Sequence, residues 1–121
     1  MTAIDTDTEA RIREWLTLPE AAERLGLDIT RVRQLLRERQ LLAVRRGERA
    51  TLQVPAAFLG EGKPVKGLPG TLTLLADAGY SDAEALRWLF REDDSLPGTP
   101  VQALAENRGR EVKRRAQALA L

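Results

Sequence analysis

Apolar residues recur at helical spacing near the start of the chain. Four of them fall on one side of a helix with 3.6 residues per turn: Leu18, Ala21, Ala22 and Leu25. Thr17 is suited to cap this helix, Pro19 suits its first turn, and Glu20 stands three residues after Thr17, as in a capping box. Gly26 is typical of a helix C-terminus. The pattern therefore predicts a helix over residues 18–25.

A second helix is predicted over residues 29–38, with Asp28 as its N-terminal cap. Its apolar positions share one arc: Ile29, Val32, Leu35 and Leu36. The opposite arc and its flank carry polar residues: Thr30, Arg31, Arg33, Gln34 and Arg37. Arginine and glutamine side chains form paired hydrogen bonds with the edges of guanine and adenine, and a threonine near the helix N-terminus suits a phosphate or a thymine methyl group. This face is therefore predicted to contact DNA.

The spacing between the two helices indicates a helix-turn-helix. Ala22 lies four residues before Gly26, where a small side chain lets two helices cross closely, and Val32 follows six residues after Gly26. Gly26 suits a turn that requires a positive φ angle. An αα-hairpin with no nucleic-acid role can show the same spacing.

A β-hairpin is predicted over residues 41–54, where two apolar runs flank the turn at Gly47. Three arginines stand at this turn: Arg45, Arg46 and Arg49. A turn that only reverses the chain requires no arginine, whereas guanidinium groups pair with phosphates or enter a narrow minor groove. The hairpin is therefore predicted to be the wing of a winged helix-turn-helix, although charges also keep a solvent-exposed edge hairpin soluble.

The second half of the chain is predicted to be helical. Residues 60–67, GEGKPVKG, are rich in glycine, proline and lysine and indicate a linker. Helices are predicted after it at residues 68–78, from Ser81 through Phe90, and from Thr99 to the C-terminus with a break near Gly109. Four large residues are expected to form the core of a small bundle, with a ligand pocket or a partner surface as the alternative: Tyr80, Trp88, Leu89 and Phe90.

These elements predict a mainly α fold with a small β-hairpin wing. Residues 1–14 are polar without a clear period and are expected to be a flexible acidic tail. The winged helix-turn-helix is expected over residues 15–60 and a helical C-terminal domain over residues 61–121.

Charge is distributed unevenly along the chain. The net charge is +1, but residues 24–49 hold eight arginines against Asp28, Glu38 and Glu48, which gives that segment a charge of +5. Such a patch attracts a polyanion, so double-stranded DNA is the predicted partner.

The composition argues against several classes of site. The chain has no cysteine and no histidine, which removes most zinc sites and nucleophilic triads, so no metal, cofactor or catalytic residue is predicted and the chain is not expected to be an enzyme. It has no apolar run of the roughly 20 residues that a membrane helix needs. We expect a cytoplasmic, nucleoid-associated protein without a membrane partner.

The N-terminal segment raises a question of regulation. Thr6 and Thr8 lie among acidic residues in a stretch that an enzyme's active site could reach if it were mobile. A phosphate group there would add about −1.5 to −2 charge. Thr6 and Thr8 are therefore candidate phosphorylation sites for a Ser/Thr protein kinase, with an inert tail as the alternative.

The sequence also resembles a small actinobacterial family of winged-helix DNA-binding proteins. The resemblance rests on LPEAAERLG, LRERQLLAVRRGERATLQVP and PVQALAENRGREVKRRAQALAL, and most specifically on VKGLPGTLTLLADAGYSDAEALRWLF. It covers nearly all of residues 15–121 and implies an N-terminal winged helix-turn-helix, a helical C-terminal domain, DNA binding and no known catalysis. The acidic, threonine-bearing tail also looks like a kinase target.

A second interpretation belongs to a different functional class. A winged helix can bind protein instead of DNA, with the C-terminal bundle as the partner surface, as in an antitoxin. A salt-dependent DNA shift assay separates this interaction module from a transcriptional regulator.

Overall fold

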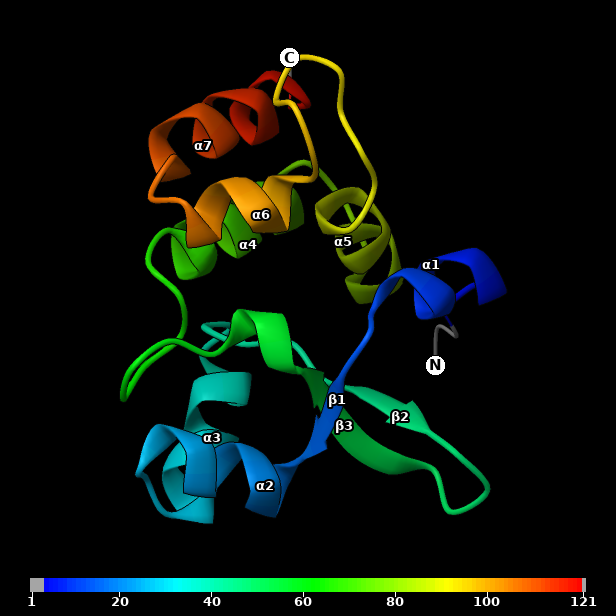
Figure 1. Cartoon of the computed structure of the whole chain (residues 1–121), viewed down its shortest axis with the longest axis vertical. Helices are drawn as coiled ribbons and strands as arrows, with labels where there is room; N and C mark the ends of the chain where they lie inside the picture. Colours follow the sequence, from blue (N-terminus) through cyan, green and yellow to red (C-terminus); the bar gives the residue numbers. More distant parts are fainter. Residues whose placement is uncertain (1–3, 121) are drawn as a thin grey trace.

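The computed structural model describes residues 4–120, which form a mostly helical protein with one small sheet (Figure 1). The N-terminal half contains α1 (Thr6–Arg11), β1 (Trp15–Thr17), α2 (Leu18–Leu25), α3 (Ile29–Arg37), β2 (Val44–Arg46), β3 (Thr51–Pro55) and the 3-10 turn η1 (Ala56–Phe58). The C-terminal half contains α4 (Leu68–Asp77), α5 (Asp82–Leu89), α6 (Pro100–Ala105) and α7 (Gly109–Ala118). Every helix in this part of the chain is too short or too polar to cross a membrane.

The predicted helix-turn-helix is present as α2 and α3. The Thr17 hydroxyl accepts a hydrogen bond from the Glu20 amide at 3.3 Å, and the Glu20 carboxylate accepts one from the Thr17 amide at 2.8 Å. Gly26 ends α2 with φ at 70°, a left-handed conformation that glycine adopts without steric cost. The Asp28 carboxylate then caps α3 by accepting from the Arg31 amide at 3.0 Å. Both helices therefore begin and end where the sequence predicts.

The apolar stripes of the two helices form their common core. Ala21 and Val32 are completely buried, and Leu25 and Leu35 are nearly so. Burial of an aliphatic side chain of this size contributes roughly 1.5–3 kcal/mol. The opposite face of α3 is consequently left to solvent.

The sheet has three antiparallel strands in the order β1-β3-β2, one more than the predicted hairpin. The extra strand is β1, in which Leu16 pairs with Val54 of β3. A three-residue strand that runs directly into a helix is too short to show an alternating pattern. The hairpin strand β2 also begins late: Leu41 and Leu42 are buried in the core ahead of it, and only Val44 of the predicted apolar run belongs to it.

The expected flexible tail over residues 1–14 is wrong for residues 6–11, which form α1; residues 1–3 lie outside the described part of the chain. The Asp5 carboxylate caps this helix by accepting from the Thr8 amide at 2.7 Å. Thr8 and Ile12 are buried. A helix of six residues shows too few apolar positions for a period, and its order comes from packing against the rest of the protein.

The C-terminal helices also follow their capping signals. Ser81 with Glu84, and Thr99 with Gln102, form capping boxes at the starts of α5 and α6. The predicted break near Gly109 lies just before it, at Asn107 with φ at 62°, and Gly109 begins α7.

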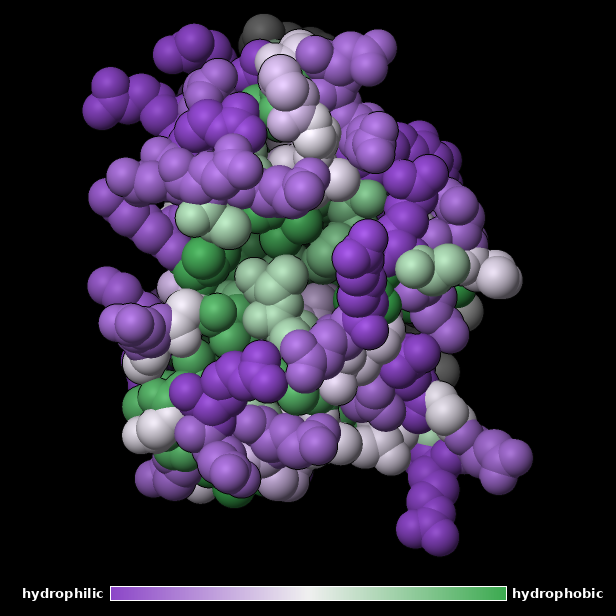
Figure 2. All heavy atoms as spheres, in the orientation of Figure 1, coloured by the Kyte–Doolittle hydropathy of each residue, from purple (hydrophilic) through white to green (hydrophobic). Residues whose placement is uncertain are grey.

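The two halves share one continuous cluster of buried side chains. Phe58 of η1 lies against Phe90, which follows α5, with ring centroids 5.6 Å apart. Arg39, which follows α3, pairs with Asp82 of α5 at 2.9 Å. On the face of the molecule drawn in Figure 2, hydrophobic side chains gather at mid-height, between the helical half above and the winged-helix half below. The segment that follows α3 is thereby held against the C-terminal half.

Candidate nucleic-acid interface

The solvent-facing side of α3 carries the predicted DNA-contacting residues. The side chains of Thr30, Arg31, Arg33 and Arg37 are exposed, and Gln34 is half-buried. Capping by Asp28 leaves the first turn of α3 open to solvent, so Thr30 stands at the N-terminal end of an exposed helix. The helix therefore presents donors along one face with little apolar surface among them.

Two of these side chains already have a partner on the same helix face. The Gln34 amide donates to the Glu38 carboxylate at 3.0 Å, and the Arg31 guanidinium lies 4.0 Å from the same group. Glu38 therefore holds both side chains parallel to the helix. Within residues 4–120, Arg33 and Arg37 have no acidic group within 4.0 Å.

The wing is the turn between β2 and β3. Gly47 adopts a φ of 80°, and the Ala50 amide donates to the Gly47 carbonyl at 3.1 Å. Arg49 is exposed in this turn. Arg45 is exposed on β2, and its guanidinium donates to the Ala50 carbonyl at 3.0 Å, across the turn. Arg45 and Arg49 thus place two guanidinium groups near the tip of the wing.

Arg46 differs from Arg45 and Arg49, the other two arginines predicted to lie on the wing. Its side chain is 25% exposed, and the guanidinium carbon lies 4.4 Å from the centroid of the Trp15 ring. It donates to the Gln53 side chain at 3.0 Å and to the Glu9 carboxylate at 3.1 Å. Successive residues of a strand point to opposite faces, so Arg45 and Arg46 do not present the same surface.

The positive segment of residues 24–49 is therefore partly neutralised in the folded protein. Four of its arginines form ion pairs: Arg24 with Glu14, Arg31 with Glu38, Arg39 with Asp82 and Arg46 with Glu9. The other four arginines of the segment are Arg33, Arg37, Arg45 and Arg49. These lie on the exposed side of α3 and on the wing, so the uncompensated charge is carried by two elements that follow one another along the chain.

The N-terminal threonines have unequal environments. Thr6 is exposed in the first turn of α1, whereas Thr8 is 2% exposed. Hydrogen bonds from Thr8 lower the pKa of Asp5, and the charges of Arg87 and Arg91 lower it further. Thr6 is therefore accessible in the folded protein, whereas access to the Thr8 hydroxyl requires α1 to open.

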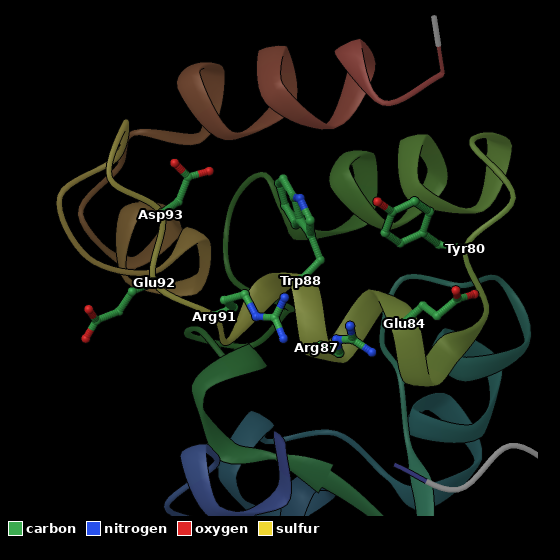
Figure 3. A pocket seen from close by; sticks show the side chains of 7 residues that line it. All are labelled: Tyr80, Glu84, Arg87, Trp88, Arg91, Glu92 and Asp93. Atoms are coloured by element: carbon green, nitrogen blue, oxygen red, sulfur yellow. The ribbon is translucent and has the colours of Figure 1, made fainter. Parts of the chain in front are cut away.

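A small hollow on the C-terminal half, of about 220 Å³, is lined by Tyr80 and Trp88 with Arg87 and Arg91 below them (Figure 3). Tyr80 and Trp88 are half-buried, while Leu89 and Phe90 belong to the core, so the predicted aromatic core is only partly formed. No group of three or more acidic side chains within residues 4–120 is placed to hold a metal ion.

Comparison with known proteins identifies both halves of the chain. Residues 4–59 match the family described as "DNA-binding protein Rv2175c, wHTH domain", and residues 65–120 match the "Rv2175c C-terminal domain of unknown function". The DNA-binding protein Rv2175c of Mycobacterium tuberculosis is 46% identical, over 85% of this chain and 78% of that protein. The NMR structure of Rv2175c superimposes with a TM-score of 0.80 at 40% identity, over 100% of this chain and 87% of that one.

The matched residues include α2, α3, the wing and all four C-terminal helices, so they cover the surface described above as well as the fold behind it. The chain belongs to the Rv2175c family of winged helix-turn-helix DNA-binding proteins.

Proposed function

We propose that this protein is a DNA-binding transcriptional regulator that inserts α3 into the major groove and lays its wing on the sugar-phosphate backbone. The observation that carries the proposal is the position of the uncompensated arginines. Arg33 and Arg37 lie on the exposed side of α3, and Arg45 and Arg49 lie on the wing. A helix and a wing whose guanidinium groups have no acidic partner match a groove and its flanking phosphates.

The side chains of α3 divide into base-reading and backbone-contacting groups. Gln34 and Arg37 are assigned to base edges, because amide and guanidinium groups form paired hydrogen bonds with adenine and guanine. Thr30 and Arg31 are assigned to the backbone or to a thymine methyl group near the helix N-terminus. In the free protein the Gln34 amide lies 3.0 Å and the Arg31 guanidinium 4.0 Å from the Glu38 carboxylate. Both side chains must leave this carboxylate before they contact DNA, so DNA replaces Glu38 as their partner.

The wing residues play two roles in this proposal. Arg45 and Arg49 contact phosphates or the minor groove. Arg46 fixes the wing strand against β1 and α1 through Trp15 and Glu9. It contributes to DNA binding mainly through the position of the wing.

The N-terminal segment is a candidate control element. Glu9 of α1 already touches Arg46 of the wing strand, so a phosphate on this segment acts close to the DNA-binding surface. Thr6 is the accessible acceptor for a Ser/Thr protein kinase, and extra negative charge beside the wing competes with DNA phosphate. Because its proposed partner is chromosomal DNA, we propose that the protein is cytoplasmic and nucleoid-associated.

The deciding experiment is a DNA shift assay with the full-length protein at several salt concentrations. The proposal expects binding to duplex DNA that weakens linearly on a log–log plot of affinity against salt. The variant Arg45→Ala/Arg49→Ala should bind more weakly than a variant with Arg87→Ala and Arg91→Ala, which removes the same charge from exposed positions on the C-terminal half. Absence of binding at low salt would instead favour a protein-interaction module.

A further inference from the structure

The helix α7 carries a second cationic surface at the other end of the molecule from the wing. Its exposed residues recur at helical spacing and form what is called here the α7 stripe: Arg110, Lys113, Arg114 and Gln117. The opposite side of the helix packs into the core through Val112 and Ala116, which are completely buried. The stripe therefore lies on the exposed side of the helix, outside the buried core of the bundle.

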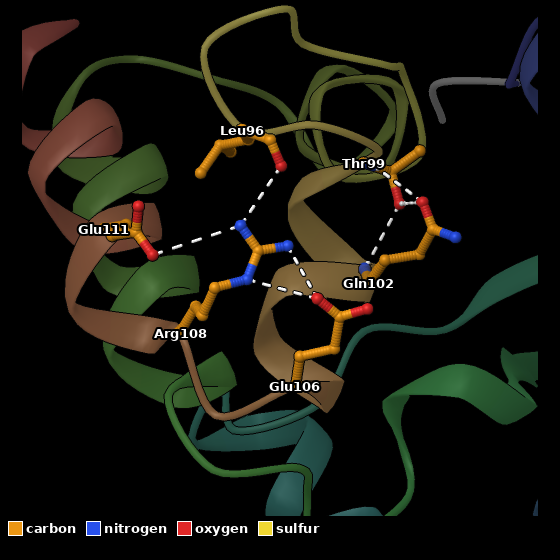
Figure 4. A network of polar contacts seen from close by, with 6 residues as sticks. All are labelled: Leu96, Thr99, Gln102, Glu106, Arg108 and Glu111. Atoms are coloured by element: carbon orange, nitrogen blue, oxygen red, sulfur yellow. Dashed lines mark hydrogen bonds and ion pairs between the residues drawn. The ribbon is translucent and has the colours of Figure 1, made fainter.

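The acidic residue of α7 does not neutralise this stripe. Glu111 is turned toward Arg108, with its carboxylate 4.0 Å from the guanidinium. Figure 4 shows Arg108 between Glu111 and Glu106, while it also donates to the Leu96 carbonyl at 3.2 Å. Within residues 4–120, no carboxylate lies within 4.0 Å of the cationic groups of Arg110, Lys113 or Arg114.

The stripe is built onto a rigid surface. Gly70 of α4 leaves room for the Lys113 side chain, because a Cβ atom at Gly70 would lie 2.8 Å from the Lys113 Cε. The start of α7 packs against the loop of residues 60–67. A Cβ atom at Gly109 would lie 3.6 Å from the Gly67 Cα and 3.9 Å from the Lys66 carbonyl oxygen. The lysine charge is therefore held at a fixed part of the surface.

The loop of residues 60–67 connects this surface to the helix-turn-helix. The loop is ordered by two hydrogen bonds, from the Gly60 amide to the Lys63 carbonyl at 2.8 Å and from the Val65 amide to the Phe58 carbonyl at 2.9 Å. A Cβ atom at Gly62 would lie 3.9 Å from the carbonyl oxygen of Leu25, the last residue of α2. In Figure 1 the loop lies at the left, between α3 below and α7 above.

Lys63 and Lys66 are both exposed on this loop. Lys63 and Lys66 thus add two cations to a loop that contacts the end of α2 through Gly62 and the start of α7 through Lys66 and Gly67. Together with Arg110, Lys113 and Arg114 they make five exposed cations, and Glu61 is the exposed acidic residue of the loop itself. A cationic surface of this kind complements the phosphates of duplex DNA.

We propose that the C-terminal domain is a second DNA-contact surface: when α3 occupies the major groove, Lys63, Lys66 and the α7 stripe bind the backbone of the same duplex beyond the site that α3 reads. This assignment rests on the proposed function. Phosphate contacts carry no sequence information, so the surface adds affinity and length of footprint without adding base preference. The C-terminal domain then lengthens the stretch of duplex that the protein contacts.

The test compares two charge-matched variants of the full-length protein on a duplex of about 30 base pairs, long enough for about three helical turns. Lys113→Gln/Arg114→Gln removes two cations from the stripe, and Arg87→Gln/Arg91→Gln removes two exposed cations beside the hollow in Figure 3. The slope of log affinity against log salt should become shallower by up to about 1.8 for the stripe variant, at about 0.9 per phosphate contact. The control variant should keep the slope of the unmodified protein.

A cross-linking measurement locates the contact directly. Because the chain has no cysteine, Gln117→Cys provides one attachment point for a photoreactive group, and Glu92→Cys on the other side of the domain provides the control. The label at position 117 should cross-link to the duplex and the label at position 92 should not. Equal slopes for both variants, or equal cross-linking at both positions, overturn the proposal. If the unmodified protein binds DNA and the stripe variant matches it, only this inference fails; if the unmodified protein does not bind, both fail.

Discussion

The guanidinium carbon of Arg46 lies over Trp15, 4.4 Å from the centre of its ring, and the same guanidinium reaches Glu9 of α1. This contact joins the wing strand to β1 and to the N-terminal helix. A cation over an indole ring contributes about 0.5–2 kcal/mol, depending on how far it is desolvated. Arg46 thus stabilises the sheet, whereas Arg45 and Arg49, the other arginines of the hairpin, are exposed to solvent.

The first prediction concerns the stability of the wing. Arg46→Ala should lower the free energy of unfolding by about 1–3 kcal/mol, because it removes the stacking on Trp15 and the hydrogen bond to Gln53. Arg45→Ala, an exposed neighbour, should stay within about 0.5 kcal/mol of the unmodified protein. Denaturant unfolding followed by tryptophan fluorescence measures both. Equal destabilisation by the two substitutions would contradict a structural role that is specific to Arg46.

The second prediction concerns the free arginines of the wing. Arg45→Ala/Arg49→Ala should weaken binding to all duplex sequences alike. The slope of log affinity against log salt should become shallower by up to about 0.9 for each lost phosphate contact. Titration of two unrelated duplexes at four salt concentrations measures both effects. An unchanged slope would leave these arginines with solubility as their only role.

The third prediction concerns base reading by α3. Gln34→Ala and Arg37→Ala should each relax base preference at a particular position of the bound site, at a cost of roughly 1–3 kcal/mol if the contact is paired. Selection of bound sequences from a random library gives the preference of each variant. If a substitution weakens binding equally to selected and unselected sequences, that residue contacts a phosphate and the base-reading assignment is wrong.

Local signals in the sequence were sufficient to predict most of the helical structure. Thr17, Ser81 and Thr99 each start a helix with a capping box, and Gly26 ends one, because these interactions depend on residues three or four positions apart. The exposed side of α3 followed from the same periodicity. These predictions needed no knowledge of distant contacts.

The parts that could not be predicted depend on distant contacts. Strand β1 exists because Leu16 pairs with Val54, and nothing in a three-residue segment indicates its partner. The role of Arg46 depends on Trp15 and Glu9, which are more than thirty residues away in the sequence. The alternation of strand residues does indicate that Arg45 and Arg46 point to opposite faces, and this signal was available from the sequence.

The fourth prediction concerns stability in acid. The Ser81 amide donates a hydrogen bond to the Glu84 carboxylate at 2.9 Å, and this bond, followed by the interaction with the Ser81 side chain, lowers the pKa of Glu84 below its ordinary value of 4.5. A lowered pKa in the folded state means that the capping box stabilises the protein above pH 4.5 and that this contribution is lost as the pH falls through the folded-state pKa. The pKa of Glu20 is lowered by Thr17 in the same way.

The variant Glu84→Gln removes the titrating group but keeps a side chain that can accept the Ser81 hydrogen bond. It should melt below the unmodified protein at neutral pH, and the difference should shrink once the pH is below the folded-state pKa of Glu84. Thermal unfolding at neutral and acidic pH measures this. Glu92→Gln removes the same charge outside a capping box and serves as the control. A difference in melting temperature that is independent of pH would contradict the argument.

The last prediction concerns the N-terminal helix. Thr6→Glu places a charge at the exposed start of α1, where a carboxylate interacts favourably with the helix dipole, so folding should be unaffected. Because Glu9 already brings α1 to the wing strand, the added charge should lower DNA affinity at low salt and have less effect at high salt. Thr8→Glu must bring its carboxylate out of a buried position, so it should displace α1 and lower the melting temperature. Thr6→Gln and Thr8→Ser are the uncharged controls. Measurement of DNA affinity at two salt concentrations, together with the melting temperature of each variant, separates charge competition from loss of the helix. If Thr6→Glu and Thr6→Gln bind DNA equally at low salt, α1 does not control binding through its charge.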